Sequence, residues 1–334
     1  MGEGGIGAAA RRAPEGTADG VIAIDWGSSR LRAWLLDPDG TIVSRRSGDQ
    51  GAIGLPRERF DAVLAQTVGD WAQARPGAPL VACGMVGARG AWVEAPYVDL
   101  PAGVDAIRDR RVRVPTSLGR DLSVVGGLRT AGPDVLRGEE TQALGIGLAD
   151  GLLCMPGTHS KWLALRGGVI GAFTTWFTGE LFDLLGTHGS LAKAFGDPAP
   201  VDESSFDAGV GQALEPGADA MWLGRLFGFR ARVVGQGSPG SHERARLSGW
   251  LIATELRQAL GGPFGEAGPV PSDGAHDARL VLVGESALAG LYERALPAVL
   301  AALPAARRER LPPGFVRADA DCAARGLFRI ATGS

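Results

Sequence analysis

The fold is indicated by the stretch VIAIDWGSS at residues 21–29, where an apolar run ends at an acid and passes directly into a turn of glycine and serine. The apolar run has the length and composition of a buried strand, and the turn residues end it. The residues that follow are expected to add further strands and one amphipathic helix, which indicates an α/β protein. These expected elements are strands over Leu31–Leu36, Ile42–Ser47 and Pro79–Val86, and a helix over Arg57–Ala74.

The same order of elements returns in the second half of the chain, beginning with LLCMPGTHS at residues 152–160. Here too an apolar strand runs into a glycine turn that carries hydroxyl groups. The elements expected after this turn are strands over Lys161–Leu165 and Val169–Phe177 and a helix from Thr178 through Leu185. Two copies of one supersecondary unit predict two similar α/β domains, over residues 21–149 and 150–334, after a disordered tail over residues 1–20. The alternative is coincidence in a chain with 52 glycines.

Paired glycine turns of this kind are suited to binding phosphate. Glycine lets backbone N–H groups approach phosphate oxygens, and hydroxyl groups add further donors. Phosphoryl transfer depends mainly on such positioning and on neutralising charge. Asp25 stands directly before the first turn and suits a hydrated Mg²⁺, which takes few carboxylates; the alternative is an acid that only shapes the turn. The residues expected to cradle phosphates are Gly27, Ser28, Ser29, Gly157 and Thr158.

Composition and charge exclude several classes of protein. The 334 residues carry a formal net charge of −3, so no basic field exists to hold a nucleic acid. No apolar run approaches the ~20 residues that a membrane-spanning helix needs, and residues 1–20 lack the hydrophobic block of a secretion signal. Cys83 and Cys154 lie within apolar runs, and the three cysteines do not form a disulfide framework. They predict a protein of the reducing cytoplasm.

Four motifs, taken in order, resemble those of the superfamily that contains sugar kinases, heat-shock ATPases and actin. Residues 25–29, DWGSS, are similar to its first phosphate motif, and residues 157–159, GTH, are similar to its second. Residues 282–288, LVGESAL, resemble its adenosine motif, and Asp319–Gly326 resembles its final connecting helix. The resemblance implies two actin-like (ribonuclease H-like) domains with an ATP cleft between them. The further nucleotide contacts that it implies are Gly284, Glu285, Ser286 and His159, the last being alternatively a turn histidine held by neighbouring backbone.

Longer motifs are similar to those of the 2-dehydro-3-deoxygalactonokinase family, over the chain from about residue 20 to its end. They are IDWGS at 24–28, GMVG at 84–87, RGEETQ at 137–142, MPGTHSKW at 155–162, TGEL at 178–181 and LSG at 247–249. The resemblance implies ATP, Mg²⁺ and transfer of phosphate to the 6-hydroxyl of 2-dehydro-3-deoxy-D-galactonate, in galactonate catabolism. The implied partner is a small-molecule sugar acid, and a homo-oligomer is left open. Alternatives are a kinase for another sugar or sugar acid, or a non-catalytic nucleotide-dependent sensor.

The resemblance places the catalytic base at Glu139 or Glu140, at the start of an expected helix that continues through Leu148. Related sugar kinases have an acid here, near the acceptor hydroxyl, and it is commonly Asp. Either glutamate could be the base, with Glu139 preferred; the alternative is that both acids only complement the helix dipole. A second departure is Met155-Pro156, where the superfamily often has an acid. This leaves Asp25 as the main candidate for metal contact.

The family's acceptor carries a carboxylate, so basic side chains and backbone amides are expected to bind it. Arg32 and Lys161 each follow a phosphate turn and are alternatively phosphate contacts. The glycine-rich segment Cys83–Tyr97 is non-periodic, which is typical of a ligand loop at a strand end. Trp26 and Trp92 are expected either to wall the sugar pocket or to lie in the core. The acceptor-binding candidates are Trp26, Arg32, Met85, Gly87, Arg89, Trp92, Arg137 and Lys161.

Overall fold

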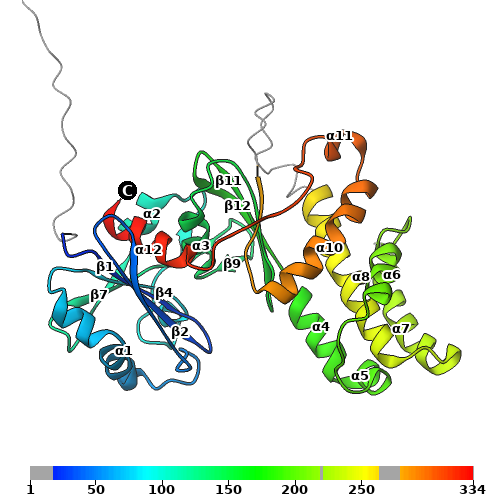
Figure 1. Ribbon diagram of the computed structural model, residues 1–334, viewed down its shortest axis with the longest axis horizontal. Coiled ribbons are helices and arrows are strands. Elements are labelled where there is room, and N and C mark those ends of the chain that lie inside the picture. The colour runs from blue at the N-terminus through cyan, green and yellow to red at the C-terminus, as the bar shows by residue number, and fades with distance from the viewer. Residues whose placement is uncertain (1–17, 219–220, 263–278, 334) are drawn as a thin grey trace, which may run out of the picture. The chain divides into compact units, whose positions relative to one another are not determined.

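The chain forms two compact units in the computed structural model, which describes residues 18–218, 221–262 and 279–333 (Figure 1). The first unit comprises the chain up to Val98, Val104–Gly127 and the residues from Ala323 onward. The second comprises Asp99–Gly103 and Leu128–Cys322. Residues 1–17 of the tail expected over residues 1–20 lie outside the described part of the chain. The boundary between two functional domains, expected between residues 149 and 150, stays a prediction.

The first unit is built on a six-stranded sheet with its own helices. The strands are β1 (Val21–Trp26), β2 (Leu31–Leu36), β3 (Ile42–Gly48), β4 (Leu80–Gly84), β6 (Val112–Pro115) and β7 (Asp121–Val124), and the helices are α1 (Phe60–Ala74), α2 (Val104–Asp109) and α12 (Cys322–Thr332), with 3-10 turns at Arg57–Arg59 and Met85–Gly87. The strand order is β3-β2-β1-β4-β7-β6. Successive side chains of β1 point to opposite faces, so Ile22, Ile24 and Trp26 enter the core with α1. Asp25 therefore points to the other face.

The second unit carries a five-stranded sheet, a set of helices and a small additional sheet. The main strands are β10 (Gly151–Met155), β11 (Ser160–Arg166), β12 (Val169–Trp176), β13 (Arg279–Leu282) and β14 (Val316–Arg317). The helices are α3 (Glu139–Ile146), α4 (Thr178–Thr187), α5 (Gly189–Phe195), α6 (Glu203–Ala213), α7 (Trp222–Gln236), α8 (Gly240–Gly261), α10 (Ser286–Ala302) and α11 (Ala305–Arg308). The main sheet has the order β12-β11-β10-β13-β14. A three-stranded sheet pairs β5 (Val98–Asp99), β8 (Leu128–Arg129) and β9 (Val135–Leu136) in that order.

The sequence repeat is confirmed by the topology of the two larger sheets. In the first unit β3, β2 and β1 pair antiparallel, and β1 then pairs in parallel with β4. In the second unit β12, β11 and β10 pair antiparallel, and β10 then pairs in parallel with β13. The two glycine turns follow β1 and β10, so they occupy equivalent positions in their sheets. The chain therefore has the expected α/β class, with two similar actin-like domains.

Several elements have other bounds than the sequence predicts; α3, for example, ends at Ile146 and not at Leu148. For two of them the structure shows the physical reason. The strand expected over Pro79–Val86 ends at Gly84, because this glycine takes a φ of 90° and a 3-10 turn begins directly after it. The last helix, expected over Asp319–Gly326, begins at Cys322. Before it, the Asp319 carboxylate accepts a hydrogen bond of 2.7 Å from the backbone N–H of Asp321, which turns the chain into the helix.

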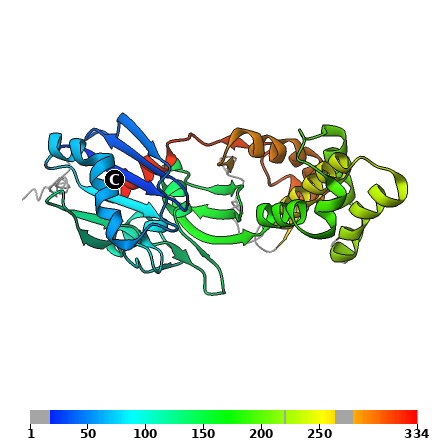
Figure 2. The ribbon, with the colours of Figure 1, turned by 90° about the horizontal axis from the view of Figure 1, so that it is seen from below.

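Helix α8 lies in the apolar core of the second unit. Its buried face includes Trp250, Leu256 and Leu260, and it packs against α6, α7 and α10. In both views α6, α7 and α8 lie side by side (Figure 1 and Figure 2). No helix within the described ranges combines the length and the apolar character that crossing a bilayer requires.

Candidate functional site

The first glycine turn follows β1 and leaves Ser28 and Ser29 exposed. Gly27 closes the turn through a hydrogen bond of 2.9 Å from its N–H to the carbonyl oxygen of Arg30. The loop after β3 braces the turn, because a Cβ on Gly51 would lie only 2.1 Å from the carbonyl oxygen of Ser28. Glycine at position 51 is therefore what permits this close approach. The two serine hydroxyls face solvent as possible phosphate donors.

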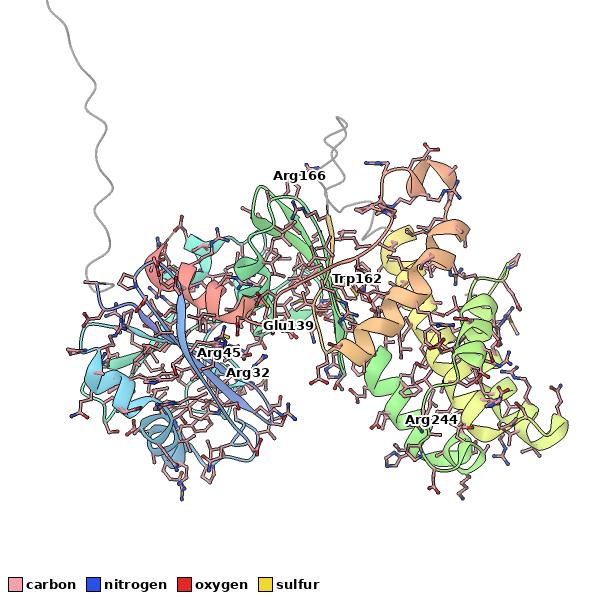
Figure 3. The ribbon with its side chains drawn as sticks, in the orientation of Figure 1. Arg32, Arg45, Glu139, Trp162, Arg166 and Arg244 are labelled. Carbon is pink, nitrogen blue, oxygen red and sulfur yellow. The ribbon has the colours of Figure 1, made fainter. Side chains whose placement is uncertain are left out.

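Asp25 lies at the end of β1 and is 8% exposed. Its Oδ2 atom accepts a hydrogen bond of 2.5 Å from Nη2 of Arg32, its direct partner across β1 and β2 (Figure 3 labels Arg32). Its Oδ1 atom lies 3.9 Å from Sγ of Cys83. Within the described residues no three acids, histidines or cysteines gather as a metal cluster. A single carboxylate fits Mg²⁺, which keeps several waters and takes one or two carboxylates.

A surface pocket of about 390 Å³ lies in the first unit, between the loop after β3 and the turn after β4. It brings Met85 and Arg89 together with a loop that the sequence had not singled out. Arg89 supplies the charged side chain of the pocket. This side chain is 88% exposed, and its Nε atom lies 3.4 Å from a carboxylate oxygen of Glu94. Gly87 is buried, and its carbonyl accepts a hydrogen bond of 2.9 Å from the N–H of Ala95. The lining residues are Ala52, Ile53, Gly54, Leu55, Pro56, Met85, Ala88, Arg89, Gly90 and Ala91.

The two tryptophans expected near the sugar lie in an aromatic cluster of the first unit. Trp26 is fully buried with its ring centroid 5.1 Å from that of Phe60, and Trp92 stacks on the same phenylalanine at 5.8 Å. The indole N–H of Trp26 donates to the carbonyl oxygen of Gln50 at 3.0 Å. Both rings are turned into the core, so direct contact with a ligand would need a change in this packing. That these two tryptophans form a wall of the sugar pocket stays a prediction.

The second glycine turn is braced by the start of α4. A Cβ on Gly179 would lie 2.2 Å from the carbonyl oxygen of Gly157, and the N–H of Glu180 donates to the carbonyl oxygen of Thr158 at 2.8 Å. The imidazole of His159 contacts the Glu180 carboxylate through Nε2. The histidine is thus held by a side chain of α4, and its contact with a nucleotide stays a prediction. Gly157 is half-buried and Thr158 is exposed, so both can be reached by a ligand.

The adenosine motif lies beside this turn. β10 and β13 pair in parallel, and the N–H of Val283 donates to the carbonyl oxygen of Cys154 at 2.9 Å. The carboxyl ends of parallel neighbours meet at one edge of a sheet, which is where α/β proteins bind ligands. Gly284 has a φ of 156°, and a Cβ on it would lie 3.6 Å from the carbonyl oxygen of Pro156. Glu285 and Ser286 are exposed at the start of α10. Residues of the second turn and of the adenosine motif therefore lie at the same edge of the second sheet.

Glu139 is linked to the second turn by a lysine. Glu139 opens α3 directly after Gly138, whose φ of 103° lets the chain enter the helix (Figure 3 labels Glu139). One carboxylate oxygen of Glu139 lies 3.2 Å from Nζ of Lys161, and the other accepts a hydrogen bond of 3.0 Å from the N–H of Arg137. Nζ of Lys161 also donates to the carbonyl oxygen of His159 at 3.0 Å. The side chain of Glu139 is 24% exposed and can meet a ligand.

Glu140 is sealed inside the second unit, with no exposed surface. Its carboxyl group accepts hydrogen bonds from the N–H of Gly138 at 2.6 Å and from the hydroxyl of Thr141 at 2.9 Å. Burial, and secondly the charge of Glu139, raise the pKa of Glu140 to about 8. The group is therefore protonated at neutral pH and out of reach of an acceptor. Of the adjacent pair, Glu139 is the one whose carboxylate can serve as a base.

Replacing Glu140 by glutamine is expected to stabilise the protein at high pH. An acid that is protonated when folded and ionised when unfolded makes folding less favourable as the pH rises from about 4.5 to about 8. Glutamine is neutral throughout. Its amide oxygen can accept the hydrogen bond from the N–H of Gly138, and its NH₂ group can donate to the hydroxyl of Thr141. We expect a gain of about 1–3 kcal/mol at pH 8 that shrinks toward zero near pH 5, measured by urea unfolding. The same gain at both pH values would contradict a protonated, buried Glu140.

Comparison with known proteins decides the family. A family model for 2-keto-3-deoxy-galactonokinase matches residues 25–316, which span both glycine turns and the glutamate pair. The chain belongs to this family. A relative from Rhizobium meliloti (strain 1021), named a probable 2-dehydro-3-deoxygalactonokinase, is 36% identical over 289 residues, which cover 84% of this chain and 90% of the relative. The 2-dehydro-3-deoxygalactonokinase of Escherichia coli (strain K12) is 36% identical over 283 residues, which cover 83% of this chain and 89% of the relative.

A solved structure supports the same assignment to the 2-keto-3-deoxy-galactonokinase family. It is the crystal structure of a candidate 2-dehydro-3-deoxygalactonokinase from Sinorhizobium meliloti, 32% identical to this chain. The likeness has a TM-score of 0.75 and covers 94% of this chain and 98% of that chain. The likeness extends over nearly the whole chain, so it includes the sheets, turns and helices that position the site.

Two features of this galactonokinase-family chain were not singled out from the sequence. The pocket loop over residues 52–56 follows β3 as a short non-periodic run with Gly51 before it and Gly54 within it, which is a weak sign of a ligand loop. Glu255 is a second omission: it is fully buried on α8, at helical spacing from Ile252 and Ala259. An acid on an otherwise apolar helix face is a signal that the sequence does contain.

Proposed function

We propose that the chain is an ATP-dependent kinase that phosphorylates 2-dehydro-3-deoxy-D-galactonate on its terminal 6-hydroxyl, in galactonate catabolism. The observation that carries this proposal is the family match over residues 25–316, together with the 36% identity to relatives of that name. We further propose that the protein acts in the cytoplasm, where ATP is available. The three cysteines are buried free thiols, in keeping with a reducing compartment.

The nucleotide is proposed to bind at the edge of the second sheet where the two motifs meet. Backbone N–H groups and the hydroxyl of Thr158 would contact phosphate oxygens, and the exposed turn at Gly284 would meet the nucleoside. The hydroxyls of Ser28 and Ser29 are proposed as further phosphate donors. Asp25 would hold Mg²⁺ mainly through its waters, and the cation would neutralise phosphate charge. That both turns act on one triphosphate stays a prediction.

Glu139 is proposed to accept the proton of the acceptor hydroxyl. As the O–H bond breaks, the hydroxyl oxygen attacks the terminal phosphorus of ATP and the bond from that phosphorus to the ADP oxygen breaks. Lys161 would orient the carboxylate, since its ammonium lies 3.2 Å from one carboxylate oxygen of Glu139. Closure that excludes water would limit wasteful hydrolysis of ATP.

Arg89 is proposed to bind the carboxylate of the sugar acid. Among the basic candidates, Arg32 already pairs with Asp25 at 2.5 Å and Lys161 pairs with Glu139 at 3.2 Å. A further candidate, Arg137, is half-buried. Arg89 has a looser pair of 3.4 Å and an 88% exposed side chain, and it lies in a pocket with otherwise uncharged walls. A guanidinium can hold a carboxylate through two parallel hydrogen bonds, while the apolar wall suits the carbon that lacks a hydroxyl.

A panel of acceptors tests this function. With ATP and Mg²⁺, release of ADP should be fastest with 2-dehydro-3-deoxy-D-galactonate, slower with related sugar acids and near background with neutral hexoses. Arg89→Ala should raise the KM for the acid by about tenfold or more and leave the KM for ATP unchanged. Faster turnover on a neutral hexose would indicate another sugar kinase. Binding of ATP and acid without any ADP release would indicate a sensor.

A further inference from the structure

One acid of the second unit has no part in the mechanism above. Glu255 lies on α8, 1% exposed, within an otherwise apolar cluster. Its Oε1 atom accepts a hydrogen bond of 2.9 Å from the indole N–H of Trp162 (Figure 3 labels Trp162), and its Oε2 atom accepts one of 2.8 Å from the hydroxyl of Tyr292. The Tyr292 hydroxyl lies 3.1 Å from Oγ of Ser160. A hydrogen bond with the side chain of Thr178 also lowers the pKa of the Glu255 carboxyl group.

The partners of Glu255 stand directly behind the proposed nucleotide site. Ser160 is the first residue of β11 and follows the second glycine turn without an intervening residue. Thr178 is the first residue of α4, whose next two residues brace that turn. Tyr292 lies on α10, which begins at Ser286 just after the glycine of the adenosine motif. One carboxyl group thus joins the supports of both nucleotide motifs.

Such a group is not what core packing alone would select. Burying an acid is unfavourable even when it is hydrogen-bonded, and well-packed apolar side chains of similar size often serve the core as well or better. Burial raises the pKa of Glu255, while its hydrogen bonds oppose the rise. The hydrogen bonds from the indole and the hydroxyl are directional. They therefore fix the relative positions of α8, α10 and the start of β11, which dispersion contacts do not.

We propose that Glu255, with Tyr292 and Ser160, is a positioning cluster that holds the second phosphate turn and the start of α10 in register for ATP. This inference rests on the proposed nucleotide site. It makes Glu255 a positioning residue, since its side chain is buried and acts through the residues that it holds. The affinity for ATP should therefore depend on the cluster, whereas the affinity for the sugar acid should not.

Tyr292→Phe tests the proposal, because it removes one hydroxyl and keeps the ring. Measured by calorimetry on the full chain, the dissociation constant for ATP should rise about five- to tenfold, while the KM for the sugar acid changes less than twofold. The matched control is Val299→Ala, which truncates a fully buried side chain of the same helix two turns away. It should lower the melting temperature by several degrees and leave ATP binding unchanged.

A second variant keeps the test decisive if Tyr292→Phe fails to fold. Ser160→Ala removes a smaller hydroxyl from the same cluster and should weaken ATP binding in the same direction. The proposal is overturned if both cluster variants bind ATP as the unaltered protein does, or if Val299→Ala weakens ATP binding equally. Because ATP binding is measured directly, these outcomes are separate from a failure of the acceptor assignment, which would leave the unaltered protein binding ATP without phosphorylating the acid.

Discussion

Glu139→Gln is expected to lower kcat by about two to four orders of magnitude, the range that a positioned general base contributes. The substituted amide cannot take the proton of the acceptor hydroxyl. It loses the ion pair with Lys161 but can still accept the hydrogen bond from the N–H of Arg137, which supports the start of α3. The rate of ADP release is to be measured at saturating ATP and sugar acid, with circular dichroism to confirm folding.

Glu140→Gln is the matched control for this experiment. It removes the neighbouring carboxyl group of the same helical turn, and that group is buried and protonated at neutral pH. We expect kcat to stay within about threefold of the unaltered enzyme, since no group of the mechanism is lost. The assignment is reversed if Glu140→Gln abolishes turnover while Glu139→Gln keeps more than a tenth of it.

The second large effect is expected for Asp25→Asn, which should lower kcat by about 100- to 1,000-fold, the scale on which removal of one electrostatic group acts. Asparagine keeps the shape of the side chain but loses the negative charge that is proposed to hold hydrated Mg²⁺. The concentration of Mg²⁺ that gives half-maximal rate should rise by tenfold or more. Both quantities come from a Mg²⁺ titration at fixed, saturating ATP.

A surface pair of the same unit provides the control for Asp25. Asp70→Asn breaks the ion pair of 2.5 Å between Asp70 and Arg46, in which the hydrogen bond to Arg46 is the main cause that lowers the pKa of Asp70 to about 2. The Asp70 side chain is 63% exposed, so we expect only a small loss of stability and no change in the Mg²⁺ requirement. An unchanged Mg²⁺ titration in Asp25→Asn would rule out the metal role and leave Asp25 as the partner of Arg32.

Much of the fold could be predicted from local patterns. The run at residues 21–26 alternates between two buried faces of a central strand, so it is apolar almost throughout and easily found. The repeat was visible because both central strands are apolar runs that end in glycine turns with hydroxyl groups. Element ends were less predictable: Gly84 stops β4 through a backbone conformation that the apolar pattern of the segment does not reveal.

The chemical differences between neighbouring residues could not be predicted in this way. Glu139 and Glu140 are equivalent in the sequence, and only the orientation of α3 exposes the first and buries the second. The pairing of Lys161 with Glu139 likewise depends on contacts between residues far apart in the chain. Long-range contacts of this kind decide whether a side chain is protonated and whether a ligand can contact it. Short motifs carry no information about such contacts.

The central claim is that Glu139 meets the acceptor hydroxyl while the second glycine turn binds phosphate. It is tested most directly by a crystal structure with a non-hydrolysable ATP analogue and 2-dehydro-3-deoxy-D-galactonate. We predict the terminal hydroxyl of the acid at roughly 2.6–3.2 Å from a carboxylate oxygen of Glu139, with phosphate oxygens on the backbone N–H groups of residues 157–159. An acceptor hydroxyl beside a different acid, or phosphates bound away from that turn, would contradict the account.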